Sequence, residues 1–179
     1  MKGRTRFGAL LLACAFVLAL PAGASAAVFL ELSGIQGEST ARGFENQIEI
    51  REFQFDLGRD KATALFSDIT LSKELDKSSP ALMLRAANGT TIPSARIRFA
   101  ETTDAAPIVY LRYCLTGVRV NSYSQSSGDE RPTEIFSLGY NTIVQSYTQQ
   151  AAAGGGGTVF DEGWDLVKGL QFGGACGNN

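Results

Sequence analysis

The stretch from 108 to 120, IVYLRYCLTGVRV, decides the fold class of this chain. Up to Gly117, large apolar residues alternate with more polar ones, which is the period of a strand with one buried face. After Gly117 the phase reverses, and Val118 and Val120 carry the apolar pattern. A long strand that changes its buried face in this way is typical of a strongly curved sheet or a small barrel.

Segments on both sides of this stretch also read as strands. Residues 28–32 are apolar except for Glu31, and residues 95–99 alternate three apolar side chains with two arginines. Between 47 and 56 the phase shifts midway, and a β-bulge near Arg51 and Glu52 would return the apolar side chains to one face. In the last strand, the side chains expected to face the core are those of Phe136, Leu138, Tyr140, Thr142 and Val144. We therefore predict a mainly β fold, a small two-sheet β-barrel.

One segment has a helical composition instead. Ser78 and Ser79 can cap a helix, Pro80 is tolerated in its first turn, and residues 81–87 are good helix formers. Asn88-Gly89 ends the pattern, and we favour this turn over a glycosylated Asn88-Gly89-Thr90 sequon. We expect one short α-helix of two to three turns covering an open side of the barrel.

The N-terminus has the three regions of a secretory signal. Lys2, Arg4 and Arg6 precede the apolar run 9–20, and small residues follow the break at Pro21. We predict a signal peptide over 1–26, cleaved between Ala26 and Ala27. Twelve apolar residues are fewer than the roughly 20 that a spanning helix needs, so no membrane association is expected after cleavage. The mature chain is then expected to be secreted or periplasmic.

The composition excludes several chemistries. The chain has 179 residues and no histidine, which excludes His-assisted nucleophiles and His-ligated zinc. A formal charge of −2 provides no general attraction for nucleic acid. We identify no catalytic, cofactor-binding or metal-ligating residues.

Two cysteines, Cys114 and Cys176, remain in the predicted mature chain. An oxidising compartment permits a disulfide between them, and two unrelated thiols are the other interpretation. The composition changes after Gln150, so we assign 27–150 to the barrel domain and 151–179 to a Gly-rich linker and C-terminal extension. The extension is apolar enough to dock on the barrel and too short for a core of its own.

Two carboxylate clusters are candidates for enzyme sites. Asp129, Glu130 and Glu134 lie in a turn-like sequence, where an exposed hairpin is the favoured interpretation. Asp161, Glu162 and Asp165 surround Trp164, and we favour a solvated tail with an anchoring tryptophan over a calcium or sugar site. The serines between 122 and 127 have no histidine base, and glycines 154–157 lack the Lys-Ser/Thr that follows a phosphate loop.

Several separated motifs resemble the Hcp family, the ring-forming tube proteins of the type VI secretion system. The opening strand and its Gly-Glu-Ser turn are residues 29–40, and the most distinctive block leads into the helix. The motifs, in order, are FLELSGIQGEST at 29–40, IEI at 48–50, FQF at 53–55, FSDIT at 66–70, LDKSSP at 75–80, Gly89 with IPSA at 92–95, and RPTE at 131–134 with Ser137, Leu138 and Tyr140. Their order and spacing cover about residues 28–149.

The resemblance implies a two-sheet barrel with one helix, assembled head-to-tail into a hexameric ring. In the family such rings stack into a tube whose lumen can shelter effector proteins. We therefore expect a non-enzymatic, exported, ring-forming carrier, with copies of itself, protein effectors or other secretion-system components as partners. One alternative is a monomeric secreted binding module that keeps the barrel, which the short connection 58–63 and the added tail support. A second alternative is a secreted hydrolase.

Overall fold

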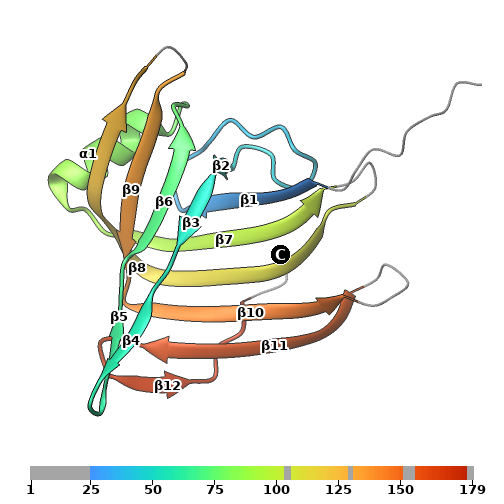
Figure 1. Cartoon of the computed structure of the whole chain (residues 1–179), viewed down its shortest axis with the longest axis vertical. Helices are drawn as coiled ribbons and strands as arrows, with labels where there is room; N and C mark the ends of the chain where they lie inside the picture. The colour runs from blue at the N-terminus through green and yellow to red at the C-terminus, as the bar shows by residue number, and fades with distance from the viewer. Residues whose placement is uncertain (1–24, 103–105, 129–130, 151–155, 177–179) are drawn as a thin grey trace, which may run out of the picture.

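The structure is a computed structural model that describes residues 25–102, 106–128, 131–150 and 156–176. Within these residues the chain forms twelve strands and one helix (Figure 1). The elements are β1 Ser25–Leu32, β2 Ile48–Ile50, β3 Glu52–Gln54, β4 Leu57–Asp60, β5 Thr63–Phe66, β6 Ile69–Glu74, α1 Ser79–Asn88, β7 Ile92–Thr102, β8 Ile108–Ser126, β9 Thr133–Gly139, β10 Thr142–Gln150, β11 Gly156–Asp165 and β12 Leu170–Phe172. The predicted mainly β class with one short helix is confirmed.

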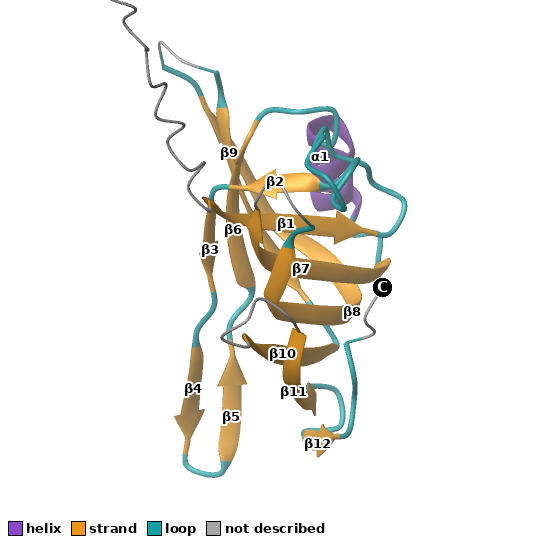
Figure 2. Cartoon of the chain, turned by 90° about the vertical axis from the view of Figure 1, so that its right-hand side faces the viewer, coloured by secondary structure: helices purple, strands orange, loops and turns teal. Residues whose placement is uncertain are grey.

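Two sheets share the long strand β8. Sheet A has the order β12-β11-β10-β8-β7-β1-β2, and sheet B consists of β3, β6, β9 and the C-terminal part of β8. All the pairings are antiparallel. The hairpin of β4 and β5 is a separate ladder beside sheet A, as Figure 2 shows from the side.

The long strand β8 turns from one sheet into the other where the sequence changes phase. Residues up to Val118 pair with β7, and residues from Arg119 pair with β9. Gly117 has a φ of 59°, a left-handed conformation that glycine adopts without strain. The predicted phase reversal is therefore the corner between the two sheets.

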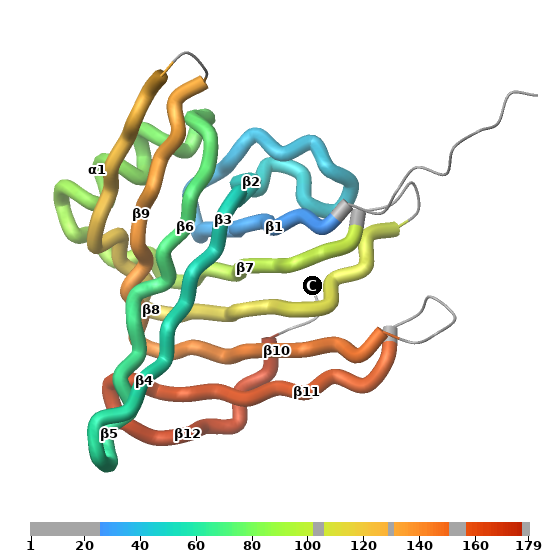
Figure 3. The backbone as a smooth tube through the Cα atoms, viewed as in Figure 1, coloured from blue at the N-terminus to red at the C-terminus, as the bar shows by residue number. Residues whose placement is uncertain are grey.

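The second corner corrects the predicted β-bulge. The strand is interrupted at Arg51, where the chain passes from one sheet to the other: β2 pairs only with β1 of sheet A, and β3 pairs only with β6 of sheet B. Figure 3 shows β2 leading into β3 across this gap. The Arg51 N–H donates to Ser72 O at 2.8 Å, which fastens the chain to sheet B.

Hydrogen bonds do not close the two sheets into a barrel, which corrects the expectation of a closed wall. Among the described residues the ladder ends at β2 and β12 in sheet A and at β3 in sheet B. Side chains close the core instead, since one cluster joins residues from both sheets and from α1. It includes Leu30, Ile48, Ile69, Leu82, Ile97, Leu115 and Phe136.

The predicted last strand is two strands. β9 belongs to sheet B and β10 to sheet A, and the chain turns between them at Tyr140 and Asn141. Phe136, Leu138 and Tyr140 are buried in the core as predicted. After the turn the phase changes, so Ile143 joins the core and Val144 faces the other side of sheet A.

The helix has nearly the predicted bounds but a different start. Ser78 precedes it in a helical conformation and makes no side-chain cap bond. Instead the Ser78 N–H donates to Asp76 Oδ1 at 2.8 Å, and the Ser79 N–H donates to Asp76 O. Gly89, at a φ of 63°, ends the helix as expected.

The C-terminal segment widens sheet A. β11 pairs with β10 along most of its length, and β12 pairs with the end of β11. Residues 151–155, the centre of the predicted Gly-rich linker, lie outside the described residues. The segment docks on the sheet by backbone pairing as well as by its apolar side chains.

Candidate assembly surface

In the part of the chain that the structure describes, part of the inner face of sheet A is exposed to solvent. Five side chains form one row across five strands, because each is the cross-strand partner of the next: Val28, Phe99, Leu111, Tyr147 and Phe160. The exposed fraction rises along the row to 47% at Tyr147 and 57% at Phe160. We call Leu111, Tyr147 and Phe160 the open face.

The open face adjoins a corner of aromatic rings. Phe53 lies between Phe99 and Tyr113, with ring centroids 5.1 and 5.0 Å away. Phe66 of the hairpin stacks on Trp164 at 6.0 Å. A cavity of about 220 Å³ lies here, lined mainly by apolar side chains. The hairpin therefore covers one end of the inner face and leaves the other exposed.

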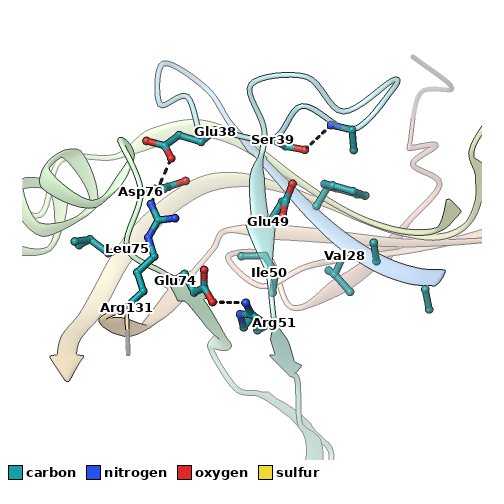
Figure 4. Close-up of a pocket in the computed structure, with 14 residues that line it drawn as sticks. Val28, Glu38, Ser39, Glu49, Ile50, Arg51, Glu74, Leu75, Asp76 and Arg131 are labelled. Atoms are coloured by element: carbon teal, nitrogen blue, oxygen red, sulfur yellow. Dashed lines mark hydrogen bonds and ion pairs between the residues drawn. The ribbon is translucent and has the colours of Figure 1, made fainter. Parts of the chain in front are cut away.

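A larger hollow of about 690 Å³ lies at the edge strand β2 (Figure 4). Its charged side chains are largely paired with one another: Arg51 with Glu74, and Arg131 with Glu38 at 3.5 Å. Glu38 also accepts the Lys77 N–H at 3.0 Å. The carboxylates thus serve ion pairs and turns.

The structure describes only one member of the first carboxylate cluster. Asp129 and Glu130 lie outside the described residues, and Glu134 is fully buried, which corrects its assignment to an exposed hairpin. Glu134 points inward because it is in phase with Phe136 and Leu138 along β9.

Glu134 forms a buried charged corner with Lys73, Asp76 and Tyr123. Lys73 Nζ, fully buried, donates to Asp76 Oδ1 and Glu74 O at 2.8 Å each and to Ser79 Oγ at 3.1 Å. These acceptors take the three ammonium hydrogens, so Glu134 Oε2, 2.9 Å away, is an ion-pair partner. The other oxygen, Oε1, accepts from Tyr123 Oη at 2.8 Å.

The pKa values in this corner follow from burial and charge. Burial raises the pKa of Tyr123 to about 12, and the Glu134 carboxylate adds to the rise. Burial opposes ionisation of Asp76, but hydrogen bonds from Lys73 and Ser78 outweigh it and lower the Asp76 pKa. The corner places one ammonium between two carboxylates and joins β6, β9 and the start of α1.

The second carboxylate cluster forms no ligand set. Asp165 accepts the N–H groups of Val167 and Lys168 at 3.0 and 2.9 Å, and backbone hydrogen bonding lowers its pKa. Glu162 accepts from Gln171 Nε2 at 2.7 Å. In the part of the chain that the structure describes, no three Cys, His, Asp or Glu residues are grouped to hold a metal ion.

Cys114 and Cys176 are joined by a disulfide, with Cα atoms 5.7 Å apart. Cys114 lies on the outer face of sheet A, opposite the core residue Tyr113, and Cys176 is 3% exposed. Cβ atoms added to Gly174 would collide with Phe172 and Val144, so the segment after β12 lies close against the sheet. We call residues 173–176 the strap.

The residues of the predicted cleavage site lie in β1. Ala26 pairs with Glu101 and Ala27 with Ala100, while residues 1–24 lie outside the described ranges. No helix among the described residues combines the length and apolar character that crossing a membrane requires. In the serine-rich stretch, Ser122 Oγ donates a hydrogen bond to Ser137 Oγ on the neighbouring strand β9, at 2.8 Å.

Sequence reasoning missed Lys73 and the open face. Lys73 was detectable in principle, because it continues the inward phase of Ile69 and Leu71 along β6. The open face was not, because its residues come from strands whose neighbours the sequence does not specify.

Comparison with known families identifies the class of this fold. Residues 29–147 match the family model described as "Type VI secretion system effector, Hcp". Because this match covers most of the chain, the protein belongs to the Hcp family. It is similar to protein Hcp1 of Pseudomonas aeruginosa, with 32% identity over 108 residues, which are 58% of this chain and 66% of that protein.

Solved structures of the family share the fold. The crystal structure of Hcp1 from Salmonella typhimurium aligns with a TM-score of 0.71 and 24% identity, covering 82% of this chain and 99% of that one. A structure described as a type six secretion system protein aligns with a TM-score of 0.75 and 24% identity, covering 83% and 100%. The alignments extend beyond the range of the family model, so the fold similarity covers nearly the whole described chain.

Proposed function

We propose that this chain is an exported, non-enzymatic structural protein that assembles into hexameric rings of the Hcp type and carries protein effectors or other secretion-system components. Membership of the Hcp family, over residues 29–147, is the observation that carries this proposal. The open face supports it, since exposed apolar surface of this kind marks protein interaction sites. A head-to-tail contact closes into a ring when its rotation fits, and otherwise extends into a filament.

Export is part of the proposal. Cleavage between Ala26 and Ala27 would release a secreted or periplasmic chain, in a compartment where the Cys114–Cys176 disulfide can form. The cleavage site lies within the β1–β7 ladder in the folded chain. Cleavage would therefore precede folding, and the mature β1 would begin at Ala27.

The position of the C-terminal extension, residues 151–179 after the 27–150 domain, favours assembly over the monomeric binding module. β11 and β12 lengthen sheet A at its edge, and the strap lies on the outer face. None of these described segments covers the open face, where Tyr147 and Phe160 stay about half exposed.

Native mass spectrometry of the protein purified from the exported fraction tests both parts. The subunit mass should correspond to a chain that begins at Ala27, and the assembly mass should be six times the subunit mass. A strict monomer at high micromolar concentration would overturn ring formation, and an uncleaved subunit would overturn export by this signal.

A further inference from the structure

The cavity between the β4–β5 hairpin and sheet A is lined by aromatic rings from three segments of the chain. Phe55 precedes the hairpin, Phe66 ends it and Trp164 lies on β11, and each ring is half-buried. The ring centroid of Phe66 lies 6.2 Å from that of Phe55 and 6.0 Å from that of Trp164. The cavity volume of about 220 Å³ is below the roughly 300–1,000 Å³ of pockets for drug-sized ligands. The cavity therefore suits a small ligand with an apolar part.

One carboxylate gives this cavity its charge. Among the described residues that line the cavity, Glu162 is the one charged side chain. It is exposed to solvent and lies on β11 in phase with Trp164. Its Oε2 accepts from Gln171 Nε2 at 2.7 Å, and no lysine or arginine in the described part of the chain forms an ion pair with it. A cationic ligand would supply the missing partner.

The basic side chains of the surrounding elements are directed elsewhere. The arginines of sheet A lie in phase with Cys114 and therefore on the outer face: they are Arg96, Arg98 and Arg112. Arg59 of the hairpin donates its Nε–H to Lys61 O at 3.0 Å. Lys168, in the turn after β11, pairs with Asp165 at 3.2 Å. The charge at the cavity is therefore negative, and it favours a cation over an anion.

Two amide side chains add hydrogen-bond acceptors to the lining. Gln145 Nε2 donates to Tyr113 Oη at 3.0 Å, and Gln171 Nε2 donates to Glu162. These bonds direct the amide nitrogens to protein acceptors and leave both amide carbonyl oxygens, with Glu162 Oε1, as acceptors for a ligand. A cation that carries N–H groups matches these oxygens, and its charge is attracted to the aromatic rings beside them.

We propose that this cavity binds a small alkylammonium ion, with the ammonium group at Glu162 and the alkyl chain against Phe66 and Trp164. A single carboxylate in an apolar lining is a poor site for a hard metal cation, which takes several oxygen ligands. A carboxylate or phosphate ligand would meet the Glu162 charge without a basic partner. This inference goes beyond the proposed function and does not depend on ring formation.

Trp164 provides the measurement, because it is the only tryptophan of the chain and lines the cavity. We expect n-butylammonium chloride to change its fluorescence saturably, with a dissociation constant in the millimolar range that is usual for so small a ligand. The neutral analogue n-butanol should bind at least about tenfold more weakly, because it lacks the charge. Sodium butyrate should bind no better than n-butanol. Equal affinities for n-butylammonium and n-butanol, or no saturable response, would overturn the proposal.

Substitutions then locate the bound ion. Glu162→Gln keeps the shape of the side chain and should weaken n-butylammonium binding about tenfold, because it removes a charged hydrogen-bond acceptor. Phe66→Leu keeps an apolar side chain and should weaken binding about threefold through loss of the ring. Glu49→Gln removes an exposed carboxylate on β2, outside this cavity, and should bind as the unsubstituted protein does. Thermal unfolding checks that each variant is folded, and binding that survives Glu162→Gln would overturn the site.

Discussion

Two regions of the molecule fasten neighbouring segments by different chemistry. In one region, the charged corner of Lys73, Asp76 and Glu134 joins β6 and β9 to the start of α1. In the other region, the Cys114–Cys176 disulfide ties the strap to the outer face of sheet A. The charged corner is buried, and the disulfide lies on the outer face of sheet A.

Because the chemistry differs, the stability of each region depends on different conditions. The charged corner forms wherever the chain folds, and its cost is the desolvation of buried charges. The disulfide adds stability only in an oxidising compartment. The corner should therefore respond to the removal of one charge and to pH, whereas the strap should respond to reductant.

The largest expected effect is loss of the cation from the charged corner. Lys73→Met leaves the Glu134 carboxylate fully buried with only the Tyr123 hydroxyl as its partner. We expect unfolding free energy to fall by about 3–5 kcal/mol, the usual cost of breaking a buried ion pair. Urea unfolding of the oxidised protein measures this.

The double variant Lys73→Met with Glu134→Leu separates charge from packing. Removing both charges should recover a substantial part of the loss, because apolar side chains of similar volume can replace a buried pair. Glu162→Gln, an exposed substitution on β11, is the control and should change stability little. A loss below about 1 kcal/mol for Lys73→Met would show that the corner is not stabilised by charge pairing.

The next effect in size is removal of the disulfide. The double variant Cys114→Ser with Cys176→Ser should lose about 2–4 kcal/mol, because the crosslink joins residues 62 apart and restricts the unfolded chain. The strap should become accessible to protease while sheet B stays protected, because Cys114 lies in the part of β8 that pairs with β7 and β10 of sheet A.

Reductant provides the internal control for this comparison. Dithiothreitol should lower the stability of the unsubstituted protein by as much as the double serine substitution does. It should leave the stability of the double serine variant unchanged. Equal stability of the oxidised and reduced proteins would show that the crosslink adds nothing to the fold.

The sequence predicted elements and phases well where the residues themselves decide them. The reversal in β8 coincides with a glycine in a left-handed conformation, and the helix has both its proline start and its glycine end. The break at Arg51 and the turn at Tyr140 were harder, because strand partners from different sheets determine them. Alternation alone does not show where a chain leaves one sheet for another.

The charged corner, the open face and the exposed side of α1 were missed for a related reason. Glu134 appears exposed when grouped with its sequence neighbours Asp129 and Glu130, yet its phase along β9 turns it inward. Met83 and Leu84 of α1 looked like ordinary helix-forming sequence. Only the packing of Leu82 into the core shows that they lie on the exposed side of the helix.

The smallest expected effect is alkaline and, of the two regions compared, arises in the charged corner. Burial and Glu134 raise the Tyr123 pKa from its ordinary value of 10.0 to about 12. The folded state therefore holds the phenolic proton more tightly than the unfolded chain does. Its contribution is fully present below pH 10 and is lost as pH rises from 10 to about 12.

Urea midpoints measured below pH 10 and between pH 10 and 12 test this. Tyr123→Phe should be less stable than the unsubstituted protein at neutral pH, because Glu134 loses a donor, but its midpoint should fall less steeply with rising pH. Some alkaline loss should persist, since burial also raises the Tyr140 pKa. If Tyr123→Phe left the dependence of the urea midpoint on pH unchanged, the charged corner would not titrate in this range. The contrast between the charged corner and the strap would then rest on charge removal and on reduction alone.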